Sequence, residues 1–132
     1  MNKIVGLFVV AMAFTSCSEA QVKSTGEQTE QAGVINKVVD ADQFKQLMTK
    51  EGVQIIDVRT ASECAGGMIE GAQNMDINSS DFSAQLATLD AKKPVLVYCR
   101  SGGRSGRAAG MMKGLGFTEV YDLRGGYMNW PK

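Results

Sequence analysis

A strand, a loop and the start of a helix are encoded by residues 95–105, which read VLVYCRSGGRS. Four consecutive apolar residues predict a strand that is covered on both faces, as in a parallel sheet. A cysteine and two glycines follow, and apolar residues at positions 108, 111, 112 and 115 predict a helix that continues to about Leu115. Ligands of open α/β sheets bind beyond the carboxyl ends of the strands, so Cys99 stands where a reactive group is expected.

Strand and helix patterns alternate on both sides of this segment. We expect strands at residues 34–39, 53–58, 74–77 and 120–123, and helices capped by Asp40 and by Ser79 or Ser80. Residues 59–71 are predicted to form a glycine-rich loop. Glycines at 102, 106, 110 and 114 are costly inside a helix, so we expect them to allow close backbone packing. The alternation predicts a parallel sheet with helices on both faces.

Composition excludes several classes of function. The 132 residues are enough for one domain, and 14 basic against 14 acidic residues leave no basic excess for general nucleic-acid binding. The absence of histidine excludes Ser-His-Asp and Cys-His nucleophiles and histidine metal sites. Three cysteines are too few for a cysteine-only zinc site or a disulfide scaffold, and we expect neither a metal nor another cofactor.

The N-terminal segment resembles a bacterial lipoprotein signal. Lys3 precedes an uncharged apolar run at residues 4–14, and small residues lead to Cys17. This predicts a signal peptide at 1–16, a lipidated Cys17, a polar tether at 17–33 and a folded domain at 34–132. The expected location is the bacterial cell envelope, on the periplasmic side, with membrane contact through the lipid alone. Cleavage after Ala20 to give a soluble secreted protein, or a buried N-terminal helix in a cytosolic protein, are the alternatives.

The environment predicted for Cys99 favours its thiolate. The N-terminus of the following helix offers unpaired N–H groups and the positive end of its dipole. Gly102 and Gly103 allow the backbone to curl into an anion-binding nest, and Arg100 and Arg104 add full charges. The same amides can hold an anionic substrate. A buried cysteine in an ordinary glycine-rich turn is the alternative, but it leaves the two flanking arginines unexplained.

Four motifs together resemble the rhodanese-like sulfurtransferases. Residues 99–105 (CRSGGRS) are similar to their active-site loop, and Asp57-Val58-Arg59 with Glu63 is similar to their first signature. Residues 67–74 (GMIEGAQN) are similar to their Gly-His-Ile-x-Gly-Ala-x-Asn segment, and residues 116–130 resemble their closing segment. Two departures are Met68 in place of the usual histidine and Cys64 in place of the usual aromatic residue.

The resemblance implies an α/β fold with a five-stranded parallel sheet flanked by helices on both faces. It also implies that Cys99 carries a persulfide between a small anionic donor such as thiosulfate and an acceptor, cyanide or a thiol. The substrate-binding loop would be formed by Arg100, Ser101, Gly102, Gly103 and Arg104. Asp57, Arg59 and Glu63 would be an ion-paired support for the loops. The protein is expected to be a monomer without a cofactor.

The length of the cysteine loop favours sulfur chemistry over phosphate hydrolysis. The loop encloses four residues between Cys99 and Arg104, whereas Cys-x5-Arg phosphatases enclose five.

Two questions stay open at this point. A membrane-tethered sulfur carrier or binding module with little turnover of its own is the alternative to a free-standing enzyme. Cys64 is either a small packing residue or a resolving thiol that forms a disulfide with Cys99.

Overall fold

The computed structural model describes residues 33–132. The expected signal peptide, the lipidation site Cys17 and nearly all of the tether therefore lie outside the described residues. In the described part, no helix combines the length and the apolar character that crossing a membrane requires.

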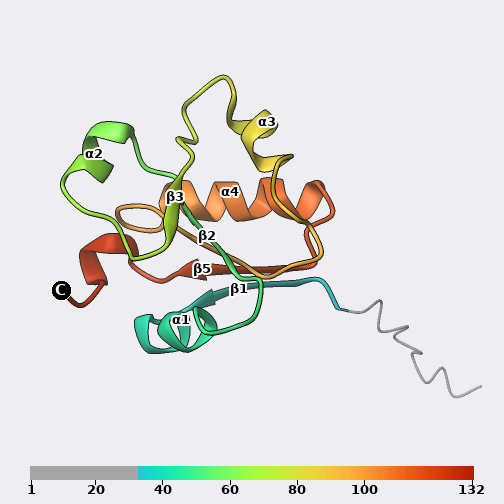
Figure 1. The fold of residues 1–132 in the computed structure, drawn as a ribbon, viewed down its shortest axis with the longest axis horizontal. Coiled ribbons are helices and arrows are strands. Elements are labelled where there is room, and N and C mark those ends of the chain that lie inside the picture. Colours follow the sequence, from blue (N-terminus) through green and yellow to red (C-terminus); the bar gives the residue numbers. More distant parts are fainter. Residues whose placement is uncertain (1–32) are drawn as a thin grey trace, which may run out of the picture.

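The five strands found within residues 33–132 form one sheet, and all of their pairings are parallel (Figure 1). The strands are β1 (Ile35–Val39), β2 (Gln54–Asp57), β3 (Ala72–Asn74), β4 (Val95–Tyr98) and β5 (Glu119–Leu123), in the order β1-β5-β4-β2-β3. β4 lies in the middle of the sheet, and its four residues are completely buried. This confirms the predicted five-stranded parallel α/β sheet and explains the uninterrupted apolar run of β4.

Helices cover the two faces of the sheet, and they are α1 (Ala41–Leu47), α2 (Ala61–Ala65), α3 (Phe82–Leu86), α4 (Gly103–Gly114) and the short 3-10 turn η1 (Gly126–Asn129). Alternate residues of β4 point to opposite faces. Val95 and Val97 pack in one apolar cluster with Met112 of α4, and Leu96 and Tyr98 pack in the other with Phe44 of α1. Figure 1 shows α3 and α4 on one side of the sheet and α1 on the other.

Local capping explains where some of these helices begin. The Asp40 side chain accepts a hydrogen bond from the Gln43 N–H, and the Asp40 N–H donates one to Gln43 Oε1, so this predicted cap is confirmed. The prediction of a loop throughout residues 59–71 is wrong. Thr60 and Glu63 form a second capping box, which starts α2 inside that segment.

Two further boundaries differ from those expected. β3 occupies residues 72–74 rather than 74–77. α3 begins at Phe82 after Asp81, so neither Ser79 nor Ser80 caps it, and the Ser79 hydroxyl accepts from the Asp81 N–H in the preceding turn.

The predicted role of the glycine row in α4 is also wrong. A Cβ added to Gly110 or Gly114 would meet nothing within 4 Å, and at Gly106 it would meet only the Asp122 Oδ2, at 3.7 Å. These helical glycines therefore do not serve a close backbone approach. The left-handed conformation is needed at Gly102, whose φ is +110°.

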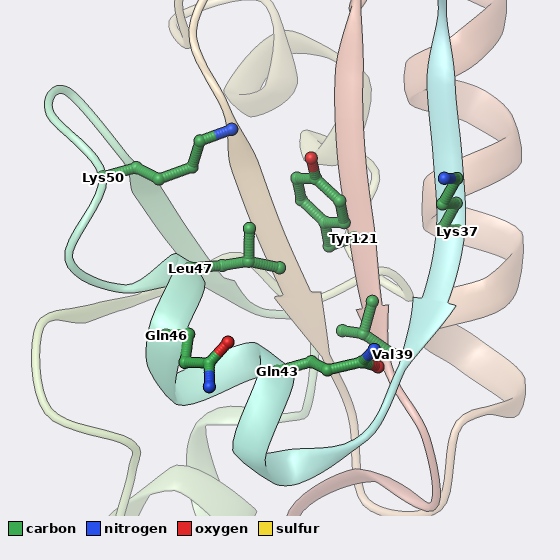
Figure 2. A pocket seen from close by; sticks show the side chains of 7 residues that line it. All are labelled: Lys37, Val39, Gln43, Gln46, Leu47, Lys50 and Tyr121. Atoms are coloured by element: carbon green, nitrogen blue, oxygen red, sulfur yellow. The ribbon is translucent and has the colours of Figure 1, made fainter.

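A cavity of about 360 Å³ lies between α1 and the strands β1 and β5 (Figure 2). Its lining consists of Lys37, Val39, Gln43, Gln46, Leu47, Lys50 and Tyr121. Val39 and Tyr121 belong to the apolar cluster on the α1 face, whereas Cys99 belongs to the cluster on the α4 face. This cavity is therefore separate from the surroundings of the predicted nucleophile.

Candidate active site

The backbone of Cys99 is held by the end of the chain. Cys99 follows β4 directly and is 1% exposed. The Tyr127 N–H donates to the Cys99 carbonyl at 2.8 Å, and the Met128 N–H donates to the Arg100 carbonyl at 3.0 Å. The 3-10 turn that follows β5 thus fixes the first two residues of the loop, because β5 is the neighbour of β4 in the sheet.

Hydrogen-bond donors converge on the Cys99 sulfur. The Gly102 N–H donates to Sγ at 3.0 Å, and the Ser105 hydroxyl donates to it at 3.4 Å. Gly102 reaches this position through its left-handed backbone, and α4 starts at the next residue. Gly103, which we expected to share this role, is an ordinary first residue of the helix. Of the amide cradle predicted from the sequence, the structure shows the hydrogen bond from Gly102, which carries the left-handed conformation.

These donors lower the pKa of the Cys99 thiol. Burial raises the pKa of Cys99, but the hydrogen bonds to its sulfur lower that pKa by more, so it lies below the ordinary value of a cysteine. The donors that meet hydrogen-bond geometry are the Ser105 hydroxyl and the Gly102 N–H. Cys99 therefore ionises more readily than an ordinary cysteine, without an imidazole beside it.

The two arginines of the loop contribute less to the thiolate than we expected. The Nη1 and Nη2 atoms of Arg104 each donate to an oxygen of the Glu63 carboxylate at 2.7 Å, so the Arg104 charge is balanced. This pairing lowers the pKa of Glu63 to about 2. Arg100 is exposed and forms no ion pair within residues 33–132. Its charge is free to meet an anion arriving from solvent.

A second ion pair supports the neighbouring loop. Arg59 Nη2 donates to Asp57 Oδ2 at 2.6 Å and to the Gly67 carbonyl at 2.7 Å, and both charged residues are buried. This bonding raises the pKa of Arg59, whose charge is permanent in any case. The pair ties the end of β2 to the segment that leads into β3.

Aromatic rings connect this ion pair to the cysteine loop. The Arg59 guanidinium lies 4.2 Å from the centre of the Tyr127 ring, and that ring stacks on Tyr98 with centres 6.1 Å apart. Tyr98 also accepts a hydrogen bond from the Ile69 N–H at 3.0 Å. Since the Tyr127 N–H holds the Cys99 carbonyl, Arg59 acts on the loop through Tyr127 and does not touch the sulfur in the structure.

Both cysteines of the described part are free thiols. Cys64 is half-buried in α2, and burial together with the nearby Asp57 carboxylate raises its pKa to about 11. A thiol with this pKa is protonated near neutrality and is a poor nucleophile. Cys64 thus differs chemically from Cys99.

Two residues of the site were not among the predicted ones. Ser105 lies six positions after the cysteine, in the first turn of α4, and this position within the motif was the available signal. Gly126 is buried with a φ of +62°, and a Cβ there would lie 2.5 Å from the Arg100 backbone and from the Cys99 carbonyl oxygen. The glycine pair at 125–126 was visible in the sequence, but its contact with the cysteine loop was not.

Comparison with known proteins agrees with this geometry. Residues 40–132 match the rhodanese-like domain family. The chain is 37% identical over 94 residues to thiosulfate sulfurtransferase GlpE of Pseudomonas putida, covering 71% of this chain and 84% of that protein. It is 38% identical over 96 residues to the uncharacterized protein YqhL of Bacillus subtilis, covering 73% of each. The crystal structure of a rhodanese-like domain protein from Staphylococcus aureus superposes with a TM-score of 0.64 at 26% identity, covering 73% of this chain and 92% of that one. The chain belongs to the rhodanese-like domain family.

Proposed function

We propose that the protein is a sulfurtransferase in which Cys99 accepts a sulfur atom from an anionic donor such as thiosulfate. The observation that carries the proposal is the convergence of the Gly102 N–H and the Ser105 hydroxyl on a cysteine sulfur at a helix N-terminus. It provides a thiolate nucleophile without histidine. The name of the Pseudomonas putida relative supports thiosulfate as the donor.

The proposed reaction has two half-reactions that each balance in charge. In the first, the Cys99 thiolate attacks the outer sulfur of thiosulfate, an S–S bond forms, and the bond to the sulfonate breaks with release of sulfite. In the second, cyanide or a thiolate attacks the outer sulfur of the persulfide, and the Cys99 thiolate leaves. The amides of residues 100–104 would hold the anionic groups in both steps, and Arg100 would attract the donor.

The test is the mass of the intact protein after exposure to thiosulfate. Wild type should gain the mass of one sulfur atom and lose it again on addition of cyanide. Cys99→Ser should gain nothing, whereas Cys64→Ser, which keeps the nucleophile, should load like wild type. A wild type that gains no sulfur, or an equal gain in Cys99→Ser, would refute the proposal.

A sulfur carrier with slow unassisted turnover is the second candidate. The 1% exposure of Cys99 favours it, because a covered sulfur is reached slowly by a free small molecule. Steady-state thiocyanate formation from thiosulfate and cyanide separates the two candidates. Loading of one sulfur without repeated turnover indicates the carrier, and sustained turnover indicates the enzyme.

We further propose that the domain acts at the periplasmic side of a bacterial envelope membrane, anchored by lipid on Cys17. The support is the apolar run at 4–14 followed by small residues and Cys17. Labelling of expressing bacteria with a fatty acid should mark the wild type and should not mark Cys17→Ser. An unlabelled wild type would exclude the anchor.

A further inference from the structure

A cavity on the face of the sheet opposite Cys99 is not used by the proposed reaction. It lies between α1 and the strands β1 and β5, and its volume is about 360 Å³ (Figure 2). Sites for small organic molecules have volumes of roughly 300–1,000 Å³. Since β1 is an edge strand of the sheet, the cavity lies at the border of the domain. Its size and place therefore suit a small ligand that arrives from solvent.

The inner part of this cavity is apolar. Val39 of β1 and Tyr121 of β5 are each 7% exposed, and Leu47 of α1 packs against the same apolar cluster. Figure 2 shows the side chains of Leu47 and Val39 and the Tyr121 ring in the space between the helix and the strands. An apolar group of a ligand placed there is removed from water, which favours binding.

The outer part of the cavity carries positive charge. The remaining lining residues are Lys37, Lys50, Gln43 and Gln46, so the lining contains two ammonium groups and no carboxylate. Lys37 is paired in register with Tyr121, which places both side chains on the cavity face of the sheet. Figure 2 shows Lys37 and Lys50 on either side of the Tyr121 ring.

The two lysines differ in what they can bind. The Lys50 ammonium group forms an ion pair with Glu119, and the Tyr121 hydroxyl donates to the same carboxylate oxygen at 2.6 Å. Lys37 forms no ion pair within residues 33–132. Because the charges of Lys50 and Glu119 cancel, Lys37 leaves a positive charge without a partner at the mouth of an apolar space.

Gln43 supplies a second hydrogen-bond donor that is held in place. Its Oε1 accepts from the Asp40 N–H at 3.1 Å in the cap of α1, which leaves the side-chain NH₂ group for an acceptor. An ammonium group and an amide N–H are donors that suit a carboxylate, and a hydrogen bond between charged partners is stronger than a neutral one. A cationic ligand is disfavoured, because Lys37 would repel it.

We propose that this cavity binds a small organic carboxylate, with the apolar body of the ligand against Tyr121 and Leu47 and its carboxylate at the Lys37 ammonium group. The inference goes beyond the proposed sulfur transfer and does not depend on it, because the cavity and Cys99 belong to opposite faces of the sheet.

The test is a titration of the isotope-labelled full chain, followed by the amide NMR signals. The probes are phenylacetate and octanoate, which carry the same charged group on a ring and on a chain. At least one of them should shift the signals of Lys37, Gln43, Leu47 and Tyr121, with a dissociation constant of about 5 mM or lower for a ligand of this size. Phenylacetamide, the neutral analogue, should bind at least about fivefold more weakly than phenylacetate.

Lys37→Met should weaken the binding of the carboxylate about fivefold, because an ion pair at a solvent-exposed rim is lost. Lys37 is exposed, so this variant should fold as wild type does. Lys113→Met is the matched control, since it removes the same charge from an exposed position of α4 on the other face, and it should bind the carboxylate as wild type does.

Three results would overturn the inference. The first is that neither carboxylate shifts the signals of the lining residues. The second is that phenylacetamide binds as tightly as phenylacetate, which would remove the role of charge. The third is that the shifts are confined to residues 99–105 and are unchanged in Lys37→Met, which would place the anion at the cysteine loop. A wild type that takes no sulfur from thiosulfate but binds the carboxylate at Lys37 would refute the proposed function and support the site.

Discussion

Replacing Gly126 by alanine should damage both the stability of the domain and the reactivity of Cys99. The added Cβ would lie 2.5 Å from the carbonyl carbon and oxygen of Arg100 and from the Cys99 carbonyl oxygen. All three atoms are backbone, so no flexible side chain can move away. The substitution also places a side chain at a φ of +62°, which only glycine adopts readily.

The expected cost combines two effects. The left-handed backbone costs about 1–2 kcal/mol for alanine, and forcing an extra carbon into a packed site costs about 1–3 kcal/mol. A loss of about 2–5 kcal/mol in the free energy of unfolding corresponds to at least about 8 °C in Tm for a domain of this size. Relief of the overlap must lengthen the Tyr127 to Cys99 and Met128 to Arg100 hydrogen bonds, so the alkylation of Cys99 should slow as well.

The assay is urea unfolding together with the rate of Cys99 alkylation at neutral pH. Gly110→Ala is the matched control, because a Cβ there meets nothing within 4 Å and Gly110 lies inside α4. This control should be more stable than wild type by about 1 kcal/mol and should react normally. A Gly126→Ala protein that unfolds within about 0.5 kcal/mol of wild type and keeps its thiol reactivity would refute the reasoning.

Three further outcomes are expected. Glu63→Gln should lower the free energy of unfolding by about 1–2 kcal/mol at pH 7, since Arg104 loses its ionised partner at a partly exposed site. In wild type this contribution is complete above the ordinary glutamate pKa of 4.5 and disappears as pH falls through about 2. The free energies of unfolding of the two proteins, measured with urea, should therefore converge across that pH window. A constant difference between them would contradict the prediction. Arg100→Ala should raise the KM for thiosulfate several-fold in a cyanide assay with little change in kcat, because its exposed guanidinium acts on the approaching anion; an unchanged KM would remove it from substrate binding. Cys64→Ala should leave sulfur loading unchanged, and it should have as many rapidly alkylated thiols at pH 7 as wild type, since a pKa of about 11 keeps Cys64 protonated. Non-reducing peptide mapping that finds Cys64 joined to Cys99 would contradict this prediction.

Local patterns in the chain were sufficient to predict the sheet and the place of Cys99 at its carboxyl edge. The apolar run of β4 indicated a central parallel strand, and the cysteine after it had to lie at the carboxyl end of the sheet. The capping pair of Asp40 and Gln43 fixed the start of α1 within four residues of sequence. These features depend on contacts between near neighbours, which periodicity and spacing record directly.

The short helix α2 was missed because its five residues hold no full apolar period. Its signal was the pair Thr60 and Glu63, and Glu63 also binds Arg104, 41 positions later in the chain. That pairing explains why the loop arginine adds little charge to the thiolate. Composition of the loop alone could not show it, because the partner comes from another element.

The surroundings of the sulfur depend on strand order. β5 pairs with β4, so residues 122–128 come to lie beside residues 97–105 although at least 17 positions separate them in the chain. This neighbourhood brings Asp122 beside Gly106 in the first turn of α4 and the Gly126 turn to the Cys99 backbone. The identity and spacing of residues indicate which chemistry is available. Burial and long-range packing determine the pKa of the Cys99 thiol and pair the charge of Arg104 with Glu63.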